Sequence, residues 1–418
     1  IYTSYIGRGW YDTITPAVIQ RNVFENPAWY TSYTPYQTEV SQGRLEALLN
    51  FQTVISDLTA MPLANCSLLD EATAAAEAAT MMYGLRSRDQ QKKGTNVLFV
   101  DESIFPQNLA VIQTRVIPQG MKIQVGNYKE LEFTPEIFAC IIQYPNASGS
   151  VEDYREFVEK AHAANCKVAV DADILSLALL LPPGEWGADI VFGSTQRLGI
   201  PLFYGGPSAA YFATRDEYKR NMPGRIIGLS KDKYGKICYR MALQTREQHI
   251  KREKATSNIC TAQALLATMA GFYAVYHGQE GIKNIAKRIH SIATWLNKAL
   301  ARLGYVQHNE IFFDTLRFSL PDHVSAQKLR TIALSKEVNL CYYDNGDVGF
   351  SIDETTDLKD VNLLLSIFSI AAEETMQEVT DIPEASSLNR DLRRRTSFLT
   401  HEVFNKYHTE TEMMRFIK

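Results

Sequence analysis

The sequence lacks the features that usually mark a disulfide-rich, metal-binding or membrane-spanning protein. Its 418 residues include only six cysteines, and no two of them have CxxC spacing, which argues against a zinc knuckle or a disulfide framework and favours a reducing compartment. No run of eighteen apolar residues is present, since the longest, from Ile174 to Leu181, already contains a serine. We therefore expect no membrane span. With 43 Lys and Arg against 47 Asp and Glu, no excess of one charge points to nucleic acid or an anionic membrane as a partner.

The sequence motifs of several common enzyme classes are also missing. The chain contains no GxxxxGK[ST] phosphate loop, no GxGxxG fingerprint, no HExxH motif and no GxSxG elbow. Nucleotide hydrolysis, dinucleotide binding, zinc-dependent proteolysis and α/β-hydrolase chemistry therefore have no support from a motif. His401 and His408 lie seven residues apart, which is not a metal-ligand spacing, so we expect no metal site.

The chain does contain an alternation of short β-rich runs and helical patterns. This alternation predicts an α/β fold with a mostly parallel sheet covered by helices on both faces. The predicted strands are 96–100, 138–144, 167–171, 189–192 and 209–213, and the predicted helices around them are 40–58, 70–82, 261–275 and 281–303. Ser150 to Asp153 resembles a capping box that would begin a further helix. In such sheets, binding sites lie at the carboxyl ends of the strands.

The pattern changes after residue 303 and predicts a second, smaller α+β domain. We divide the chain into an N-terminal arm and helix (1–60), a large α/β domain (61–290), a small α+β domain (291–375) and a C-terminal segment (376–418). The last segment is predicted to be a linker, because residues 381–395 are mostly polar or charged.

The stretch from Val168 to Pro207 is the part that points to chemistry. In the pyridoxal-phosphate enzymes built on a parallel sheet, an aspartate pairs with the pyridine nitrogen and a lysine one strand later forms the Schiff base. Asp171 is placed for the first role, but Gln196 stands where the lysine is expected. An amide cannot form an imine, so we expect a degenerate cofactor site around Asp171 and Gln196.

The predicted helix start at Asp70 indicates the same loss. A cofactor phosphate is bound by free N–H groups at a helix N-terminus, but Asp70 and Glu71 occupy this end. The two carboxylates favour the helix dipole, with Asp70 as the cap, and they would repel a phosphate dianion.

Six segments resemble one known family: residues 25–53, 64–78, 187–207, 222–229, 243–267 and 398–415. They are similar to the N-terminal half of the glycine cleavage system P protein, or glycine decarboxylase, and the resemblance covers essentially the whole chain. It implies the type I fold of pyridoxal-phosphate-dependent transferases. It also implies an enzyme that decarboxylates glycine and passes the aminomethyl group to the lipoyl arm of the H protein. The Schiff-base lysine and the bound pyridoxal phosphate belong to the second half or second subunit, so this half is expected to hold no catalytic residue.

The resemblance further implies that the working site lies at the junction of the two halves. We expect the arm to reach that site, with Tyr33, Tyr36 and Gln37 donating hydrogen bonds to the glycine carboxylate or the cofactor environment. Loss of carbon dioxide needs the breaking bond held perpendicular to the pyridine plane, and phenol hydroxyls can fix a carboxylate in that orientation. Both tyrosines are also compatible with simple aromatic packing of the arm.

The partners implied by the resemblance are a catalytic half or second subunit, glycine and the lipoylated H protein. We expect a dimer of two-half units, in the cytoplasm of a bacterium or in the mitochondrial matrix of a eukaryote. The chain, which opens at Ile1, is interpreted as a fragment whose last segment leads toward a missing catalytic half. The basic run 245–254, with Arg246, Lys251, Arg252 and Lys254, is a candidate contact for an acidic H protein, although such a run is also typical of a solvated, self-paired helix face.

Two other functions remain open from the sequence. A scaffold or dimerisation module with no site contacts would not need the paired phenols of Tyr33 and Tyr36. An independent aminotransferase-like enzyme with its own cofactor is disfavoured by Gln196 and Asp70.

Overall fold

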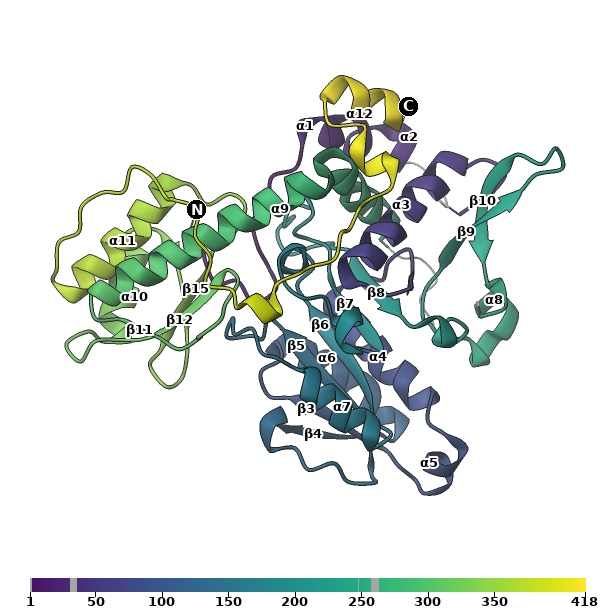
Figure 1. Cartoon of the computed structure of the whole chain (residues 1–418), viewed down its shortest axis with the longest axis horizontal. Helices are drawn as coiled ribbons and strands as arrows, with labels where there is room; N and C mark the ends of the chain where they lie inside the picture. Colours follow the sequence, from purple (N-terminus) through teal and green to yellow (C-terminus); the bar gives the residue numbers. More distant parts are fainter. Residues whose placement is uncertain (1, 31–35, 247, 257–262) are drawn as a thin grey trace.

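The computed structural model describes residues 2–30, 36–246, 248–256 and 263–418. A large domain carries the main sheet, a small domain lies beside it, and the long helix α9 (Ala264–Arg302) runs from one to the other (Figure 1). In the described part of the chain, no helix has both the length and the apolar character needed to cross a membrane.

The large domain is built on a seven-stranded, mostly parallel sheet. Its strands are, in spatial order, β2 (Leu63–Ala64), β8 (Ala210–Thr214), β7 (Ile190–Ser194), β6 (Lys167–Ala172), β5 (Ile137–Tyr144), β3 (Val97–Asp101) and β4 (Lys122–Gly126). The five strands from β7 to β4 are parallel, and β8 is antiparallel to both of its neighbours. The predicted strands are therefore confirmed, with ends that differ by one or two residues.

Helices cover both faces of this sheet, as the alternation of residues along β6 shows. Val168 and Val170 belong to the same core as α3 (Gln42–Thr59), α7 (Arg155–Ala163) and α9. Ala169 belongs to the second core, which α4 (Glu71–Gly84) and α6 (Pro106–Val116) cover. Because both faces are buried, the strands are nearly continuous apolar runs.

The small domain packs two helices on an antiparallel sheet. The sheet contains, in spatial order, β11 (Val306–Gln307), β12 (Thr315–Ser319), β15 (Val348–Ser351) and β14 (Cys341–Tyr342), and the helices are α10 (Ala326–Ser335) and α11 (Leu358–Ala372). Strand β1 of the arm (Thr3–Ser4) pairs with β13 (Val338–Asn339). The N-terminal arm therefore starts on the small domain.

Several shorter elements complete the fold. They are α1 (Ala17–Ile19), α2 (Pro27–Tyr30), α5 (Arg88–Lys92), the hairpin of β9 (Ile226–Lys231) and β10 (Ile237–Ala242), α8 (Gln248–Lys251) and α12 (Glu410–Ile417). The hairpin projects from the large domain (Figure 1).

The two helices predicted at 261–275 and 281–303 correspond to the two parts of α9, which meet at a kink. The kink is at Gly278, whose φ of 64° and ψ of −174° are not helical. A Cβ at this position would lie 2.6 Å from the carbonyl oxygen of Phe404, so the C-terminal segment packs directly on the bend.

The predicted capping box at Ser150 is wrong. Helix α7 begins only at Arg155, and its N-cap, Tyr154, makes no side-chain cap hydrogen bond. Ser150 instead forms an isolated bridge with Phe312 of the small domain, and its hydroxyl donates to Glu152 (2.9 Å). A contact between the two domains therefore prevails over the local helix signal.

Candidate functional site

A small cavity lies where the carboxyl ends of β5, β6 and β7 meet the small domain. Side chains from four parts of the chain surround it: the arm, the start of α4, the strand ends and the residues before β12. They include Arg8, Tyr11, Glu71, Gln143, Asp171, Asp173, Ser194, Arg197, Asp314 and Thr315. The free volume is about 30 Å³, which is about the space that one water molecule occupies in the liquid.

Asp171 is held at the bottom of this site by two neighbours. The amide of Asn108 on α6 donates both to Asp171 Oδ2 (2.7 Å) and to Glu71 Oε1 (2.9 Å). Burial raises the pKa of Asp171 well above its usual range, and the Glu71 carboxyl adds to the rise. Burial also raises the pKa of Glu71 to about 7. Both carboxyls therefore hold a proton more tightly than free carboxyls do.

The start of α4 explains how Glu71 reaches Asp171. Asp70 caps the helix, since its carboxylate accepts a hydrogen bond from the backbone N of Thr73 (2.7 Å). This confirms the predicted cap. Glu71 is then the first helical residue and lies against the cavity.

Gln196 is fully committed to the backbone of the arm. Its Oε1 accepts from the Tyr11 N–H (3.2 Å), and its Nε2 donates to the carbonyl oxygens of Tyr11 (2.6 Å) and Ile200 (2.9 Å). The side chain is buried. The amide therefore fixes the arm across the end of β7.

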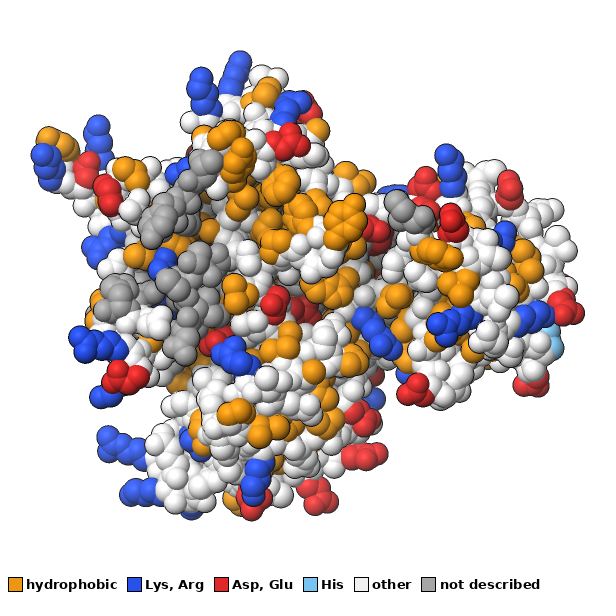
Figure 2. Space-filling view, turned by 180° about the vertical axis from the view of Figure 1, so that it is seen from behind, with side chains coloured by type: hydrophobic (Ala, Val, Ile, Leu, Met, Phe, Trp, Pro, Cys, Tyr) orange, Lys and Arg blue, Asp and Glu red, His pale blue; other side chains and the backbone are white. Residues whose placement is uncertain are grey.

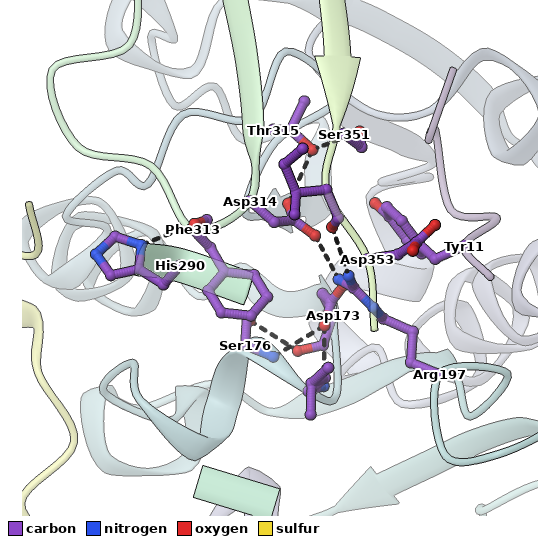
Figure 3. Close-up of polar contacts among 12 residues, drawn as sticks. Tyr11, Asp173, Ser176, Arg197, His290, Phe313, Asp314, Thr315, Ser351 and Asp353 are labelled. Carbon is purple, nitrogen blue, oxygen red and sulfur yellow. Dashed lines mark hydrogen bonds and ion pairs between the residues drawn. The ribbon is translucent and has the colours of Figure 1, made fainter. Parts of the chain in front are cut away.

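Arg197 fills the space next to Gln196. Its Nη1 lies 2.5 Å from Asp173 Oδ2 and 2.6 Å from Asp314 Oδ2, and its guanidinium carbon lies 3.8 Å from the centre of the Tyr11 ring. Figure 3 shows Arg197 pointing between the two carboxylates, with Tyr11 beside it. These contacts were not predicted from the sequence.

The residues present do not fit pyridoxal phosphate. The site has no lysine at position 196. Arg197 and Tyr11 occupy most of the cavity, whose free volume of about 30 Å³ is about one tenth of the smallest typical small-molecule pocket, since such pockets measure about 300–1,000 Å³. Asp171 is engaged by Asn108 and Glu71, so its carboxyl already has partners within the chain. The described groups therefore satisfy one another and leave no place for a ligand of that size.

The residues expected to bind substrate lie elsewhere. Tyr33 lies outside the described residues. Tyr36 is 3% exposed, and the guanidinium of Arg225 stacks on its ring at 4.2 Å. Gln37 is exposed, and its carbonyl accepts from the N–H groups of Val40 and Ser41. Neither Tyr36 nor Gln37 is among the described residues that surround the cavity.

The basic run at 245–254 divides into buried and exposed parts. Arg246 is buried and donates to the carbonyl oxygens of Met222 and Gly224, so it stabilises the turn before β9. Lys251, Arg252 and Lys254 are exposed and remain available to a partner.

Comparison with known proteins gives one family and one fold. The sequence model of the family "Glycine cleavage system P-protein" matches residues 1–368. The chain is 78% identical, over 418 residues, to a glycine dehydrogenase (decarboxylating) of Bacteroides fragilis. The match covers 100% of this chain and 44% of that protein. The chain therefore spans less than half the length of the curated relatives it matches.

Solved structures agree with this result. A crystal structure of glycine decarboxylase (P-protein) of the glycine cleavage system, in inhibitor-bound form, superposes with a TM-score of 0.80 and 30% identity, and covers 88% of this chain and 85% of that one. A C-DES mutant with glycine covalently linked to its PLP cofactor superposes with a TM-score of 0.60 at 12% identity, covering 87% and 96%, which shows the fold alone. The predicted fold, the type I fold of pyridoxal-phosphate-dependent transferases, is confirmed.

Proposed function

The chain belongs to the glycine cleavage system P-protein family, and we propose that it is the half of a glycine decarboxylase that does not bind the cofactor. In this proposal it corresponds to the N-terminal half of the longer relatives. A second half, fused or separate, carries the lysine and the pyridoxal phosphate. The 78% identity to a bacterial relative favours the bacterial cytoplasm over a mitochondrial matrix.

The observation that carries the proposal is the hydrogen bonding of the Gln196 side chain. A side chain at the lysine position that makes three hydrogen bonds to backbone groups acts as a structural tie rather than as a chemical group. The filled cavity beside it supports the same conclusion. If the chain contributes to glycine decarboxylation, it does so by shaping a site that another chain or half completes.

In that enzyme, pyridoxal phosphate on the other half supplies the electron sink for the loss of carbon dioxide from glycine. The aminomethyl group then passes to the lipoyl arm of the H protein. We assign to Tyr33, Tyr36 and Gln37 of this chain the task of orienting the glycine carboxylate. The guanidinium of Arg225 lies over the ring of Tyr36, so this tyrosine also packs within the chain.

The surface beside the degenerate site suits burial by a second half. Trp10 and Ile14 of the arm are 41% and 55% exposed, and Tyr204, in the loop after β7, is fully exposed. The two segments are neighbours, since Thr15 Oγ1 donates to the carbonyl oxygen of Gly199 (2.7 Å) and the rings of Phe24 and Phe203 lie 5.1 Å apart. Hydrophobic side chains gather across the centre of the face shown in Figure 2.

Reconstitution tests the proposal. This chain and the proposed second half are produced separately, and the release of labelled carbon dioxide from glycine is measured with H protein present. We expect activity only in the mixture, and we expect pyridoxal phosphate to stay with the other half after dialysis. Release by this chain alone, or pyridoxal phosphate attached to it after borohydride reduction, would refute the proposal.

A scaffold without site contacts is the second candidate, because Tyr36 is as buried as an ordinary core residue. The two candidates differ at Tyr33. In the reconstituted enzyme, a Tyr33→Phe variant with full turnover would favour the scaffold, since only a hydroxyl has been removed.

A further inference from the structure

Arg197 connects three parts of the molecule that are far apart in the sequence. It follows β7 in the large domain and pairs with Asp173, which follows β6 in the same domain. The same Nη1 pairs with Asp314, which precedes β12 of the small domain. Its Nη2 donates to the carbonyl oxygen of Ile352, just after β15 (3.3 Å).

The arm closes over this arginine. Tyr11 lies flat against the guanidinium, and Thr13 Oγ1 donates to Glu354 Oε2 of the small domain (2.6 Å) and lies 3.2 Å from the carbonyl oxygen of Arg197. The arm therefore crosses from one domain to the other directly above the ion pairs.

These ion pairs are buried, so removing one charge has a large electrostatic cost. Arg197 is 5% exposed and Asp314 is 3% exposed. Water screens such charges poorly, and removing one member of a buried set leaves the others without compensation. Loss of the guanidinium would leave Asp173 and Asp314 facing each other across the boundary of the two domains, where they would repel.

Other hydrogen bonds also cross this boundary: the Tyr273 hydroxyl donates to Glu354 Oε1 (2.8 Å), and Arg288 donates to the carbonyl oxygen of Glu354 (3.0 Å). The backbone N of Val151 donates to the carbonyl oxygen of Ile311 (2.8 Å), and the amide of Asn309 donates to the carbonyl oxygen of Ser148 (2.7 Å). The two domains are also joined by α9, which is kinked at Gly278.

We propose that Arg197 is an interdomain lock, which holds the large and small domains in one fixed arrangement without any ligand. The arginine occupies the space between the domains, and its two carboxylate partners lie one on each side. The lock does not depend on the function proposed above, because it follows from contacts within this chain.

Hydrogen exchange of individual backbone amides tests the lock in the whole chain. The Val151 amide reports the boundary between the domains, since its acceptor is Ile311. The Asp189 amide, which donates to the carbonyl oxygen of Val168 (2.9 Å), reports the interior of the large domain. In Arg197→Met we expect exchange at Val151 to be about 100-fold faster, with exchange at Asp189 changed much less.

Arg155→Met is the matched control. Arg155 also pairs with an aspartate, Asp153, but both side chains are about half exposed and both lie in the large domain. We expect neither amide to change in this variant, because exposed pairs contribute little. An equal acceleration of Val151 and Asp189 in Arg197→Met would show a general loss of stability and would overturn the lock, as would no acceleration at all.

A second variant keeps the test decisive if Arg197→Met does not fold. Asp314→Asn retains the shape and the arginine but removes the charge on the small-domain side. We expect Val151 exchange to be at least about 10-fold faster in this variant, again without a matching change at Asp189. An unchanged rate at Val151 would assign Arg197 to the large domain alone.

Discussion

Replacement of Gln196 by lysine tests whether the degenerate site is one residue away from function. We expect Gln196→Lys to fold poorly and to form no covalent link with pyridoxal phosphate. The Gln196 amide accepts one hydrogen bond and donates two. An ammonium can donate but cannot accept, so the N–H of Tyr11 would lose its partner.

The loss of folding stability expected in Gln196→Lys has two parts. An orphaned buried N–H costs about 1–3 kcal/mol. A buried lysine without a counter-ion sheds its proton, and at pH 7 this costs up to about 4–5 kcal/mol, from an ordinary pKa near 10.4 at about 1.36 kcal/mol per unit. The sum is a large fraction of the stability of about 5–15 kcal/mol that folded proteins have.

The control is Gln196→Met, which loses the same hydrogen bonds without adding a charge. Both variants are unfolded in urea at pH 7 and pH 9. A lysine whose folded pKa is lowered binds its proton better in the unfolded state, so its variant gains stability as pH rises, by about 2–3 kcal/mol relative to Gln196→Met over this range.

The chemical readout is a mass measurement after incubation with pyridoxal phosphate and reduction with borohydride. Modification of residue 196, together with a stability equal to that of the parent chain, would mean that the cavity opens to admit the cofactor. Our account of a filled site would then be refuted.

Three further outcomes are expected. Burial raises the pKa of Glu71 from 4.5 to about 7, so the folded state binds a proton that the unfolded state releases, and the stability of the chain falls as pH rises from about 4.5 to 7. This contribution of Glu71 is at most about 3 kcal/mol. Glu71→Gln removes it, as urea unfolding at pH 5 and pH 8 would measure. In a reconstituted enzyme, Tyr33→Phe lowers glycine turnover about 100-fold while the melting temperature of the chain stays unchanged, if the hydroxyl orients the carboxylate in the transition state. Gly278→Ala lowers the melting temperature, since its φ of 64° and ψ of −174° lie in a region essentially restricted to glycine, which costs another residue about 1–3 kcal/mol before the clash with Phe404. Gly43→Ala on α3, where nothing lies within 4 Å, is the control and leaves the melting temperature unchanged or raises it.

The parts of the fold that were predictable are those with local signals. In the strand at 167–171 the apolar run 168–170 ends in Asp171, and Asp70 precedes an alanine-rich helix. Both patterns need only neighbouring residues, and both are confirmed. The placement of Asp171 on β6 and of Gln196 just after the adjacent strand β7 follows from the same alternation.

The contacts around Arg197 were not predictable for the opposite reason. Asp314 is 117 residues away from Arg197, and no periodicity connects an arginine after one strand with an aspartate before another in a different domain. The polar segment 381–395 shows the same limit. Its composition is that of a linker, but Leu388 and Leu392 are buried, and Arg394 donates to the carbonyl oxygens of Leu58 and Leu177.

The contacts around Asp171 and Gln196 also show why such a site would have to change at several residues at once. A polar group that faced a ligand becomes a buried group without a partner once the ligand is gone, and such groups are costly. Here each one has an internal partner: Asp171 has Asn108 and Glu71, and Gln196 has the backbone of Tyr11. Replacing one side chain leaves buried groups that contacted it without a hydrogen-bond partner. Cofactor binding by this chain would therefore require at least the arm, position 71 and position 196 to change together.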